Sequence, residues 1–89
     1  MTLFKIITIK DDIVIGLSDA ELAALGGSDA GAVAHALVTK GDMSVWQYAV
    51  RKGASGDLQQ APLWKIGLIA HSSLRVEPYV TPLEIVAHT

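Results

Sequence analysis

The chain contains no cysteine, and this absence excludes several classes of protein at once. Without thiols there is no disulfide framework, no thiolate metal site and no redox-active pair. Long apolar runs are also missing, because the longest stretch without a charge is the ten residues 30–39, about half of what a membrane-spanning helix needs. The first residues lack the apolar segment of a secretory signal. We therefore expect a cytoplasmic protein with no membrane association.

Charge is scarce, since charged residues make up 18% of the 89 residues, against about 25% in a typical domain. The formal net charge is −2 and the isoelectric point is about 5.8, which is the wrong sign for general binding to a phosphate backbone. Apolar residues make up 51% and the mean hydropathy is +0.39, which excludes a disordered chain. The length fits a single domain over residues 1–89, with a surface apolar enough to need a partner.

The N-terminal segment has the pattern of a β-hairpin. Residues 3–9 and 13–17 are rich in β-branched side chains, and the polar residues 10–12 separate them. A three-residue loop at this point pairs Ile9 with Ile13. The apolar face predicted from this register consists of Leu3, Ile7, Ile9, Ile13, Ile15 and Leu17.

Two short helices are predicted after the hairpin. Ser18 and Glu21 have the spacing of a capping box, in which each side chain binds the backbone N–H of the other residue. Gly26 supplies the stop signal for this first helix. The second helix is expected over residues 28–40 or 29–40, because apolar side chains recur there at helical spacing. Its apolar stripe consists of Val33, Ala36 and Leu37, widened by Ala32.

The second half of the chain returns to strand patterns. Strands are expected over 43–52, 63–70, 74–79 and 83–88. A five-residue turn at 53–57 places Trp46 opposite Trp64, which is a favourable aromatic pair. The same register places Pro62 opposite Tyr48. Because proline cannot donate to a strand ladder, Pro62 marks either a bulge or the entry to a strand.

A second turn at 71–73 pairs Ala70 with Leu74 and continues the sheet as an antiparallel meander. Pro78 and Pro82 place the last strands at an edge. The predicted class is α+β, with an N-terminal β-hairpin, two short helices and a C-terminal antiparallel β-meander, the helices lying on one face of the sheet. Val33 and Leu37 would then pack against Trp46, Trp64, Ile66 and Leu68.

No motif supports catalysis or cofactor binding. The glycine-rich segment 26–31 has the two outer glycines of a phosphate-binding loop, but residues 32–33 are alanine and valine where that loop needs lysine and a hydroxyl side chain. The separations of the histidines do not place two imidazoles on one metal ion; the three are His35, His71 and His88. We expect no catalytic, cofactor-binding or metal-ligating residue and no cofactor.

Aromatic and basic residues are interleaved on two of the predicted strands, which is typical of surfaces that stack single-stranded nucleic acid. The possible interaction or nucleic-acid face consists of Trp46, Tyr48, Arg51, Lys52, Trp64, Lys65 and Arg75. Because its aromatic members also fit a dry sheet face, a core or a protein interface is the alternative interpretation.

One dense polar cluster has two interpretations. His71, Ser72, Arg75 and Glu77 could orient a small anion or the backbone of a partner. The alternative is a hairpin turn followed by a strand whose wet face carries an ion pair. The sequence leaves this choice open.

The order of elements over residues 13–26, a strand followed by a Leu-rich helix that ends at glycine, resembles the opening of the swapped-hairpin transition-state regulators related to AbrB. The basic DNA-contacting residues of that family have no counterpart in Asp11, Asp12, Asp19 and Glu21. The likeness covers under a third of the chain, so we assign the chain to no family.

Low charge, a high apolar content and strands that must leave sheet edges favour a small, non-catalytic interaction module that self-associates as a homodimer. Another protein is the second possible partner. A nucleic-acid-binding protein that uses the aromatic and basic face is an alternative from a different class, although the net charge disfavours it. An accessory subunit of a larger enzyme is the third hypothesis.

Overall fold

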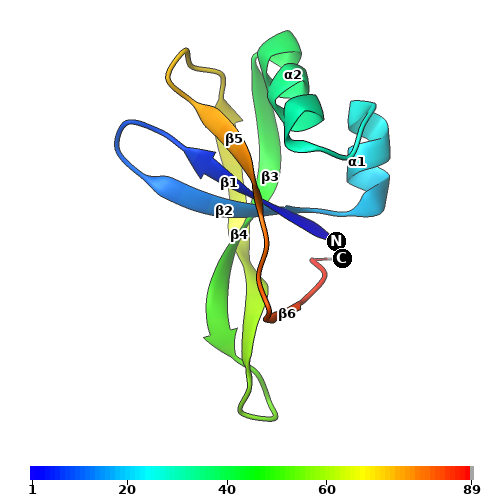
Figure 1. The fold of residues 1–89 in the computed structure, drawn as a ribbon, viewed down its shortest axis with the longest axis vertical. Coiled ribbons are helices and arrows are strands. Elements are labelled where there is room, and N and C mark those ends of the chain that lie inside the picture. Colours follow the sequence, from blue (N-terminus) through cyan, green and yellow to red (C-terminus); the bar gives the residue numbers. More distant parts are fainter. Residues whose placement is uncertain (89) are drawn as a thin grey trace.

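Six strands and two helices make up residues 1–88, the part of the chain that the computed structural model describes (Figure 1). The strands are β1 (Thr2–Ile7), β2 (Asp12–Leu17), β3 (Asp42–Lys52), β4 (Leu58–Ile69), β5 (Arg75–Tyr79) and β6 (Glu84–Ile85), and the helices are α1 (Asp19–Leu25) and α2 (Ala30–Lys40). The strands form a sheet in the order β5-β1-β2-β3-β4-β6, antiparallel throughout except between β4 and β6. The α+β class, the N-terminal hairpin and the two helices are therefore confirmed. Neither helix in residues 1–88 is long and apolar enough to cross a membrane.

The turn of the N-terminal hairpin is longer than predicted. Ile7 pairs with Asp12, so the connection consists of the four residues 8–11. The Thr8 side chain shapes this turn, because its Oγ1 accepts hydrogen bonds from two backbone N–H groups of the turn and donates to the Asp11 carbonyl. The N–H of Thr8 also donates to that carbonyl over 2.9 Å. A threonine-centred turn therefore replaces the expected three-residue loop.

The longer turn changes which side chains of β1 are in the core. Ile15 pairs with Phe4 rather than with Ile7, and Ile13 pairs with Ile6 rather than with Ile9. Because side chains alternate with a period of two, this odd shift exchanges the faces of β1. The predicted register is therefore wrong, and Ile9 is 79% exposed in the turn.

Both helices begin and end at the residues that the sequence indicates. The N–H of Glu21 donates to Ser18 Oγ over 3.1 Å, and the N–H of Ser18 donates to Glu21 Oε1 over 2.7 Å, which completes the capping box of α1. Gly26 ends α1 with a left-handed φ of 90°. Asp29 caps α2, because its Oδ1 accepts from the N–H of Ala32 over 2.8 Å. Local capping chemistry therefore determines both helices.

The helices cover one face of the sheet, as predicted, and the main core lies between them and that face (Figure 1). Its buried members are Phe4, Ile6, Ile15, Leu17, Leu22, Val33, Leu37, Val45 and Leu68. Ile66 packs against this cluster from β4. Trp46 and Trp64 are not among these residues, so their predicted packing beneath Val33 and Leu37 is wrong.

A bulge divides the β3–β4 hairpin into two registers. The pairing that the turn at 53–57 predicts holds as far as Tyr48 and Pro62. Just beyond Pro62 the register shifts by one residue, with Leu63 as the extra residue of β4. Because proline offers no N–H to the ladder, the predicted irregularity at this position is confirmed as a bulge.

The bulge places the two tryptophans on opposite faces. Trp46 pairs with Lys65, so the predicted pair of Trp46 and Trp64 is wrong. On its other side Trp46 pairs with Gly16, which lies on the face that the helices leave open. Trp64 pairs with Gln47 and therefore points to the helix-covered face, where its side chain is nevertheless exposed.

β5 pairs with β1 and not with β4, so the meander predicted through the turn at 71–73 does not continue past β4. The apolar character of β1 explains this pairing, since its most buried side chains are Leu3, Phe4 and Ile6. A strand this apolar needs a neighbour on both edges, and β5 is that second neighbour. The edge positions predicted from Pro78 and Pro82 are confirmed, because β5 and β6 are the outermost strands.

Candidate functional site

The end of the described chain crosses the sheet face that the helices leave open. We call residues 83–88 the C-terminal strap. Its strand β6 pairs with β4 at Gln59 and Gln60, and the N–H of Val86 donates to the Gln60 carbonyl over 2.8 Å. From β6 the strap runs toward α1 and ends near the N-terminus (Figure 1). The strap therefore connects the edge of the sheet with the first helix.

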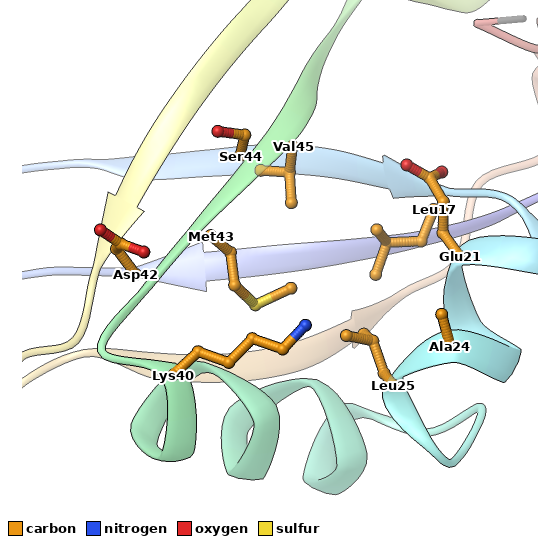
Figure 2. Close-up of a pocket in the computed structure, with 9 residues that line it drawn as sticks. All are labelled: Leu17, Glu21, Ala24, Leu25, Lys40, Asp42, Met43, Ser44 and Val45. Atoms are coloured by element: carbon orange, nitrogen blue, oxygen red, sulfur yellow. The ribbon is translucent and has the colours of Figure 1, made fainter.

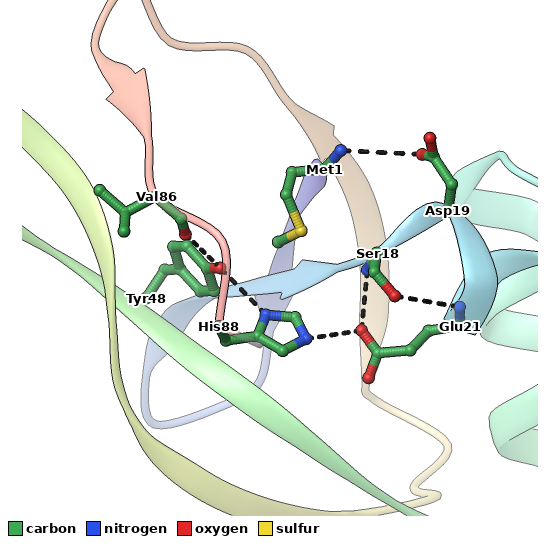
Figure 3. Close-up of polar contacts among 7 residues, drawn as sticks. All are labelled: Met1, Ser18, Asp19, Glu21, Tyr48, Val86 and His88. Atoms are coloured by element: carbon green, nitrogen blue, oxygen red, sulfur yellow. Dashed lines mark hydrogen bonds and ion pairs between the residues drawn. The ribbon is translucent and has the colours of Figure 1, made fainter.

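His88 attaches the strap to α1 and β3 (Figure 3). Its Nε2 lies 2.7 Å from Glu21 Oε1, its Nδ1 lies 3.0 Å from Tyr48 Oη, and its side chain is 1% exposed. Tyr48 Oη also lies 2.6 Å from the carbonyl oxygen of Val86. The imidazole stacks on the indole of Trp46, with 5.7 Å between ring centroids and 24° between the planes. We call Glu21, Tyr48 and His88 the clasp.

The hydrogen bonds of the clasp join two elements of the fold to the strap through one imidazole. A carbonyl oxygen only accepts, so Tyr48 donates its single hydroxyl proton to Val86. The two ring nitrogens of His88 contact the Tyr48 oxygen and the Glu21 carboxylate. The imidazole therefore connects the end of the strap with both β3 and α1.

The clasp keeps its acid ionised and its hydroxyl neutral. Burial alone would raise the pKa of the Glu21 carboxyl group, but hydrogen bonds from Ser18 and His88 outweigh it and the pKa is lowered from its ordinary value. Burial, together with the negative charge of Glu21, raises the pKa of Tyr48 to about 12. At neutral pH Tyr48 is therefore a neutral donor beside the Glu21 carboxylate.

The clasp has the acid–imidazole–hydroxyl order of a nucleophile-activating triad, but it does not have the chemistry of one. In such a triad the imidazole removes the proton of the hydroxyl group. Here the Tyr48 hydroxyl donates its proton to the Val86 carbonyl and not to the imidazole of His88. Tyr48 is only 3% exposed, so a substrate cannot reach its oxygen. The geometry holds the strap in place instead of activating Tyr48.

One polar atom has no partner where the strap meets β4. Gln60 is 3% exposed, and its side-chain oxygen Oε1 accepts no hydrogen bond from residues 1–88. Burying an amide oxygen in this way costs about 1–3 kcal/mol. Its neighbour Gln59 donates to Glu84 of the strap. This unpartnered oxygen therefore lies on the residue at which the strap pairs with β4.

An open pocket of about 340 Å³ lies between α1, the end of α2 and the start of β3 (Figure 2). It is lined by Leu17, Glu21, Ala24, Leu25, Lys40, Asp42, Met43, Ser44 and Val45. The Lys40 side chain lies along the opening in Figure 2, between Asp42 at one end and Glu21 at the other. The lining combines apolar surface with charges of both signs and includes no imidazole.

Three residues of the predicted aromatic and basic face lie close together. Trp46 and Tyr48 point to the same side of β3, and Lys65 pairs with Trp46 from β4. However, Tyr48 is buried and Trp46 stacks on His88, so the strap and the clasp occupy this surface. Lys65 is the exposed member of the three.

The other four residues of that predicted face are dispersed. Trp64 lies on the opposite face of the sheet. Arg51 and Lys52 lie at the exposed end of β3. Arg75 is on the edge strand β5, where its guanidinium lies 3.8 Å from the Glu77 carboxylate. The seven residues do not form one continuous surface, and whether any of them binds a partner stays a prediction.

β4 carries a large share of the exposed apolar surface. Four of the eight large hydrophobic side chains that are exposed in residues 1–88 belong to it: Leu58, Leu63, Trp64 and Ile69. Trp64 is 56% exposed, and its only hydrogen bond in the described chain is from Nε1 to Gln47 Oε1 over 2.9 Å. Because β6 pairs no further than Gln60, residues 64–69 have β3 on one side and no strand of residues 1–88 on the other. We call this segment the open edge of β4.

The polar cluster around His71 has the geometry of a turn. Its Nδ1 lies 3.1 Å from the N–H of Ser73 and 2.7 Å from the hydroxyl of the same residue. The N–H of Leu74 donates to the His71 carbonyl over 3.0 Å, which closes the turn. In the part of the chain that is described, no group of three or more His, Asp or Glu side chains is arranged to hold a metal ion.

No family model, curated protein or solved structure matches the chain.

The clasp is the feature that sequence reasoning missed. Glu21 was identified only as the cap of α1, and His88 received no role. The two residues are 67 positions apart, and no local pattern links them. Glu21 accepts a hydrogen bond from the Ser18 N–H and also contacts His88. The second contact cannot be inferred from the sequence, because it depends on where the strap ends.

Proposed function

We propose that the chain is a non-catalytic interaction module that self-associates as a homodimer through the open edge of β4. The observation that carries this proposal is an unpaired strand edge next to an exposed tryptophan, Trp64. Unpaired N–H and C=O groups along an edge accept a further strand, and an adjacent large aromatic side chain is the usual anchor of a protein interface. A second copy of β4 supplies both features at once, since a twofold axis can pair the strand with itself antiparallel.

The other edges of the sheet support this choice by contrast. β5 is short and includes Pro78, which has no N–H, and an ion pair between Arg75 and Glu77. β6 consists of only two residues. Proline, charge and shortness are the features that discourage pairing with another chain. The segment from Trp64 to Ile69 has a single charge, Lys65, and no proline.

The clasp supports a non-catalytic role, because the hydroxyl of Tyr48 is buried and donates to the Val86 carbonyl. Nucleic-acid binding is not favoured, because two of the three aromatic side chains that it needs, Trp46 and Tyr48, are engaged with His88. We keep the cytoplasm as the expected location, because a chain without cysteine does not depend on an oxidising compartment.

Absolute mass in solution tests the proposal. Light scattering after size exclusion is expected to give about 19 kDa, twice the 9.4 kDa of one chain, with the fraction of dimer rising with protein concentration. Trp64→Lys and Ile69→Lys are expected to shift the mass to that of a monomer. Val38→Lys is the matched control for Ile69→Lys, because Val38 is 74% exposed against 75% for Ile69 but lies on α2. A wild-type monomer at all concentrations would overturn the proposal and favour the accessory-subunit hypothesis.

A further inference from the structure

The backbone of the open edge of β4 points outward at alternate residues. The N–H of Ala70 donates to the Gly41 carbonyl over 2.9 Å, just beyond the last pair of the β3–β4 register. Hydrogen-bonded and non-hydrogen-bonded pairs alternate along an antiparallel ladder, so every second residue before Ala70 bonds to β3 and the residues between them do not. The residues whose N–H and C=O groups point to the open edge are therefore Lys65, Gly67 and Ile69.

We propose that two copies of the chain pair through this edge with Gly67 on the twofold axis, so that Gly67 faces its own copy and Lys65 faces Ile69 of the second copy. This register gives each outward-facing residue an outward-facing partner, and each such pair exchanges two hydrogen bonds. Moving the axis by one residue places either Ile69 opposite the bulge residue Leu63 or Lys65 opposite the turn residue His71. The inference rests on the proposed function, because it specifies how the self-association occurs.

The side chains on both faces of the joined sheet suit this register. Gly67 brings no side chain to the axis, and nothing lies within 4 Å of a Cβ added to it. Ile69 is 75% exposed, and the aliphatic stem of Lys65 from the second copy lies over it in the pair. On the helix-covered face the exposed Trp64 lies opposite Ala70 of the second copy. Pairing therefore covers apolar surface on both faces.

Two charges find partners in the same register. Lys65 and Asp42 form no ion pair within residues 1–88. Lys65 faces Trp46, four residues from Asp42 along β3, so about 14 Å separates the two positions within one chain.

In the dimer the two charges come closer together. Lys65 of the second copy, Ile69 and Asp42 form one row across three strands, about 10 Å from end to end. The long Lys65 side chain crosses Ile69 and directs its ammonium group toward the Asp42 carboxylate. The twofold axis repeats this contact and keeps the two copies of Lys65 about 14 Å apart. The edge thus carries both halves of its own complement, which favours a second copy as its occupant.

Cysteine cross-linking of the full chain tests the register, because the sequence contains no cysteine of its own. In Gly67→Cys the two paired Cα atoms are about 5.5 Å apart, a separation that a disulfide bond spans. We expect this variant to form a covalent dimer under mild oxidation. Lys65→Cys and Ile69→Cys are the matched controls, because each new thiol is about 14 Å along the strand from its own copy. Neither is expected to link by itself, whereas an equal mixture of the two is expected to link.

Charge reversal is the second test. Lys65→Glu and Asp42→Lys are each expected to raise the dissociation constant of the dimer by about fivefold, the size of an exposed ion pair. The double variant exchanges the two charges, so its dissociation constant is expected to return close to that of the wild type. Asp57→Lys makes the same change in net charge in the turn at 53–57 and is expected to have no effect. Sedimentation over a range of concentrations measures all four.

The outcomes distinguish the register from the proposed function. A dimer under reducing conditions that links only in a mixture of Gly67→Cys with Lys65→Cys, or with Ile69→Cys, would overturn the axis and keep the edge pairing. A dimer that links in none of these variants or mixtures would overturn the edge as its interface. A monomer at all concentrations would overturn the proposed function together with the register. The mixture of Lys65→Cys and Ile69→Cys tests the axis with Gly67 unchanged, so the test does not depend on the folding of Gly67→Cys.

Discussion

Trp46 and Trp64 lie on neighbouring strands and have opposite surroundings. Trp46 is partly buried on the strap-covered face, where its indole stacks on His88. Trp64 is 56% exposed on the other face, outside the core cluster, and donates one hydrogen bond to the side chain of Gln47. The extra residue Leu63 separates the two environments, because it shifts β4 by one position.

The comparison shows how one chain treats two similar apolar surfaces differently. The surface around Trp46 is covered by the chain itself, through a strap whose buried His88 contacts Glu21 and Tyr48. The surface around Trp64 is left open beside an unpaired edge, although a large exposed aromatic side chain is costly to keep in water. We infer that the first surface is closed within the protomer and the second is closed between protomers.

The largest expected effect on the free energy of unfolding is at Gly16, which lies on the strap-covered face. A Cβ atom added at Gly16 would lie 2.3 Å from Cε1 of Tyr48, which two hydrogen bonds hold in place. Gly16→Ala is therefore expected to destabilise the fold by about 3 kcal/mol and to weaken the clasp. Gly67→Ala on β4 is the control, because nothing lies within 4 Å of its added Cβ. Urea unfolding measures both, and equal effects would contradict the account of the covered face.

Removal of the Tyr48 hydroxyl should have the next largest effect. Tyr48→Phe leaves both the Val86 carbonyl and Nδ1 of His88 without their partner. We expect a loss of about 2 kcal/mol in the free energy of unfolding, because unmatched buried polar groups are costly. In a chain that also carries His88→Ala, Tyr48→Phe should no longer lower the free energy of unfolding, because the hydroxyl acts mainly through its contact with His88. A full loss in that background would show that the Val86 bond alone carries the effect.

The acid dependence of stability should be smaller, because Glu21 is more than a third exposed and solvent screens it. Its pKa is lowered in the folded chain, so its contribution is complete above the ordinary value of 4.5 and is lost as the pH falls through the folded pKa. Glu21→Gln should therefore be less stable than the wild type at about pH 7, and the difference should shrink as the pH falls below 4.5. A difference that persists unchanged at the acid pH would show that capping, and not charge, is responsible.

The smallest expected effect on the stability of the protomer is at Trp64. Trp64→Ser removes an exposed indole and its bond to Gln47, and we expect a loss of at most about 1 kcal/mol. The same change should abolish self-association. Urea unfolding at low protein concentration and light scattering at high concentration separate the two effects. A large loss of stability at low concentration would mean that Trp64 supports the protomer and is not free for a partner.

Features set by neighbouring residues could be predicted from the sequence. Both helix caps, the stop at Gly26, the bulge at Pro62 and the edge positions of the last strands follow from the chemistry of single side chains and the residues next to them. The hairpin register could not be predicted, because the Oγ1 bonds of Thr8 compete with the expected loop at 10–12. One such local competition was enough to exchange the faces of β1.

Features set by distant residues could not be predicted. The partner of β5 depends on the need of β1 for a second neighbour, and an apparent turn at 71–73 suggested β4 instead. The position of the strap depends in turn on β5. The contact of His88 with Glu21 therefore required the whole topology, and the exposure of Trp64 required the extent of the helices over the sheet.

The most direct test compares the two tryptophans one at a time. Trp46→Phe leaves Trp64 as the only indole, and Trp64→Phe leaves Trp46. Fluorescence and acrylamide quenching are followed as the protein concentration is raised from about 1 μM to about 1 mM. The account predicts that Trp64 becomes shielded as the concentration rises, while the shielding of Trp46 is constant. A Trp64 signal that does not depend on concentration, with a mass that stays at 9.4 kDa, would contradict it.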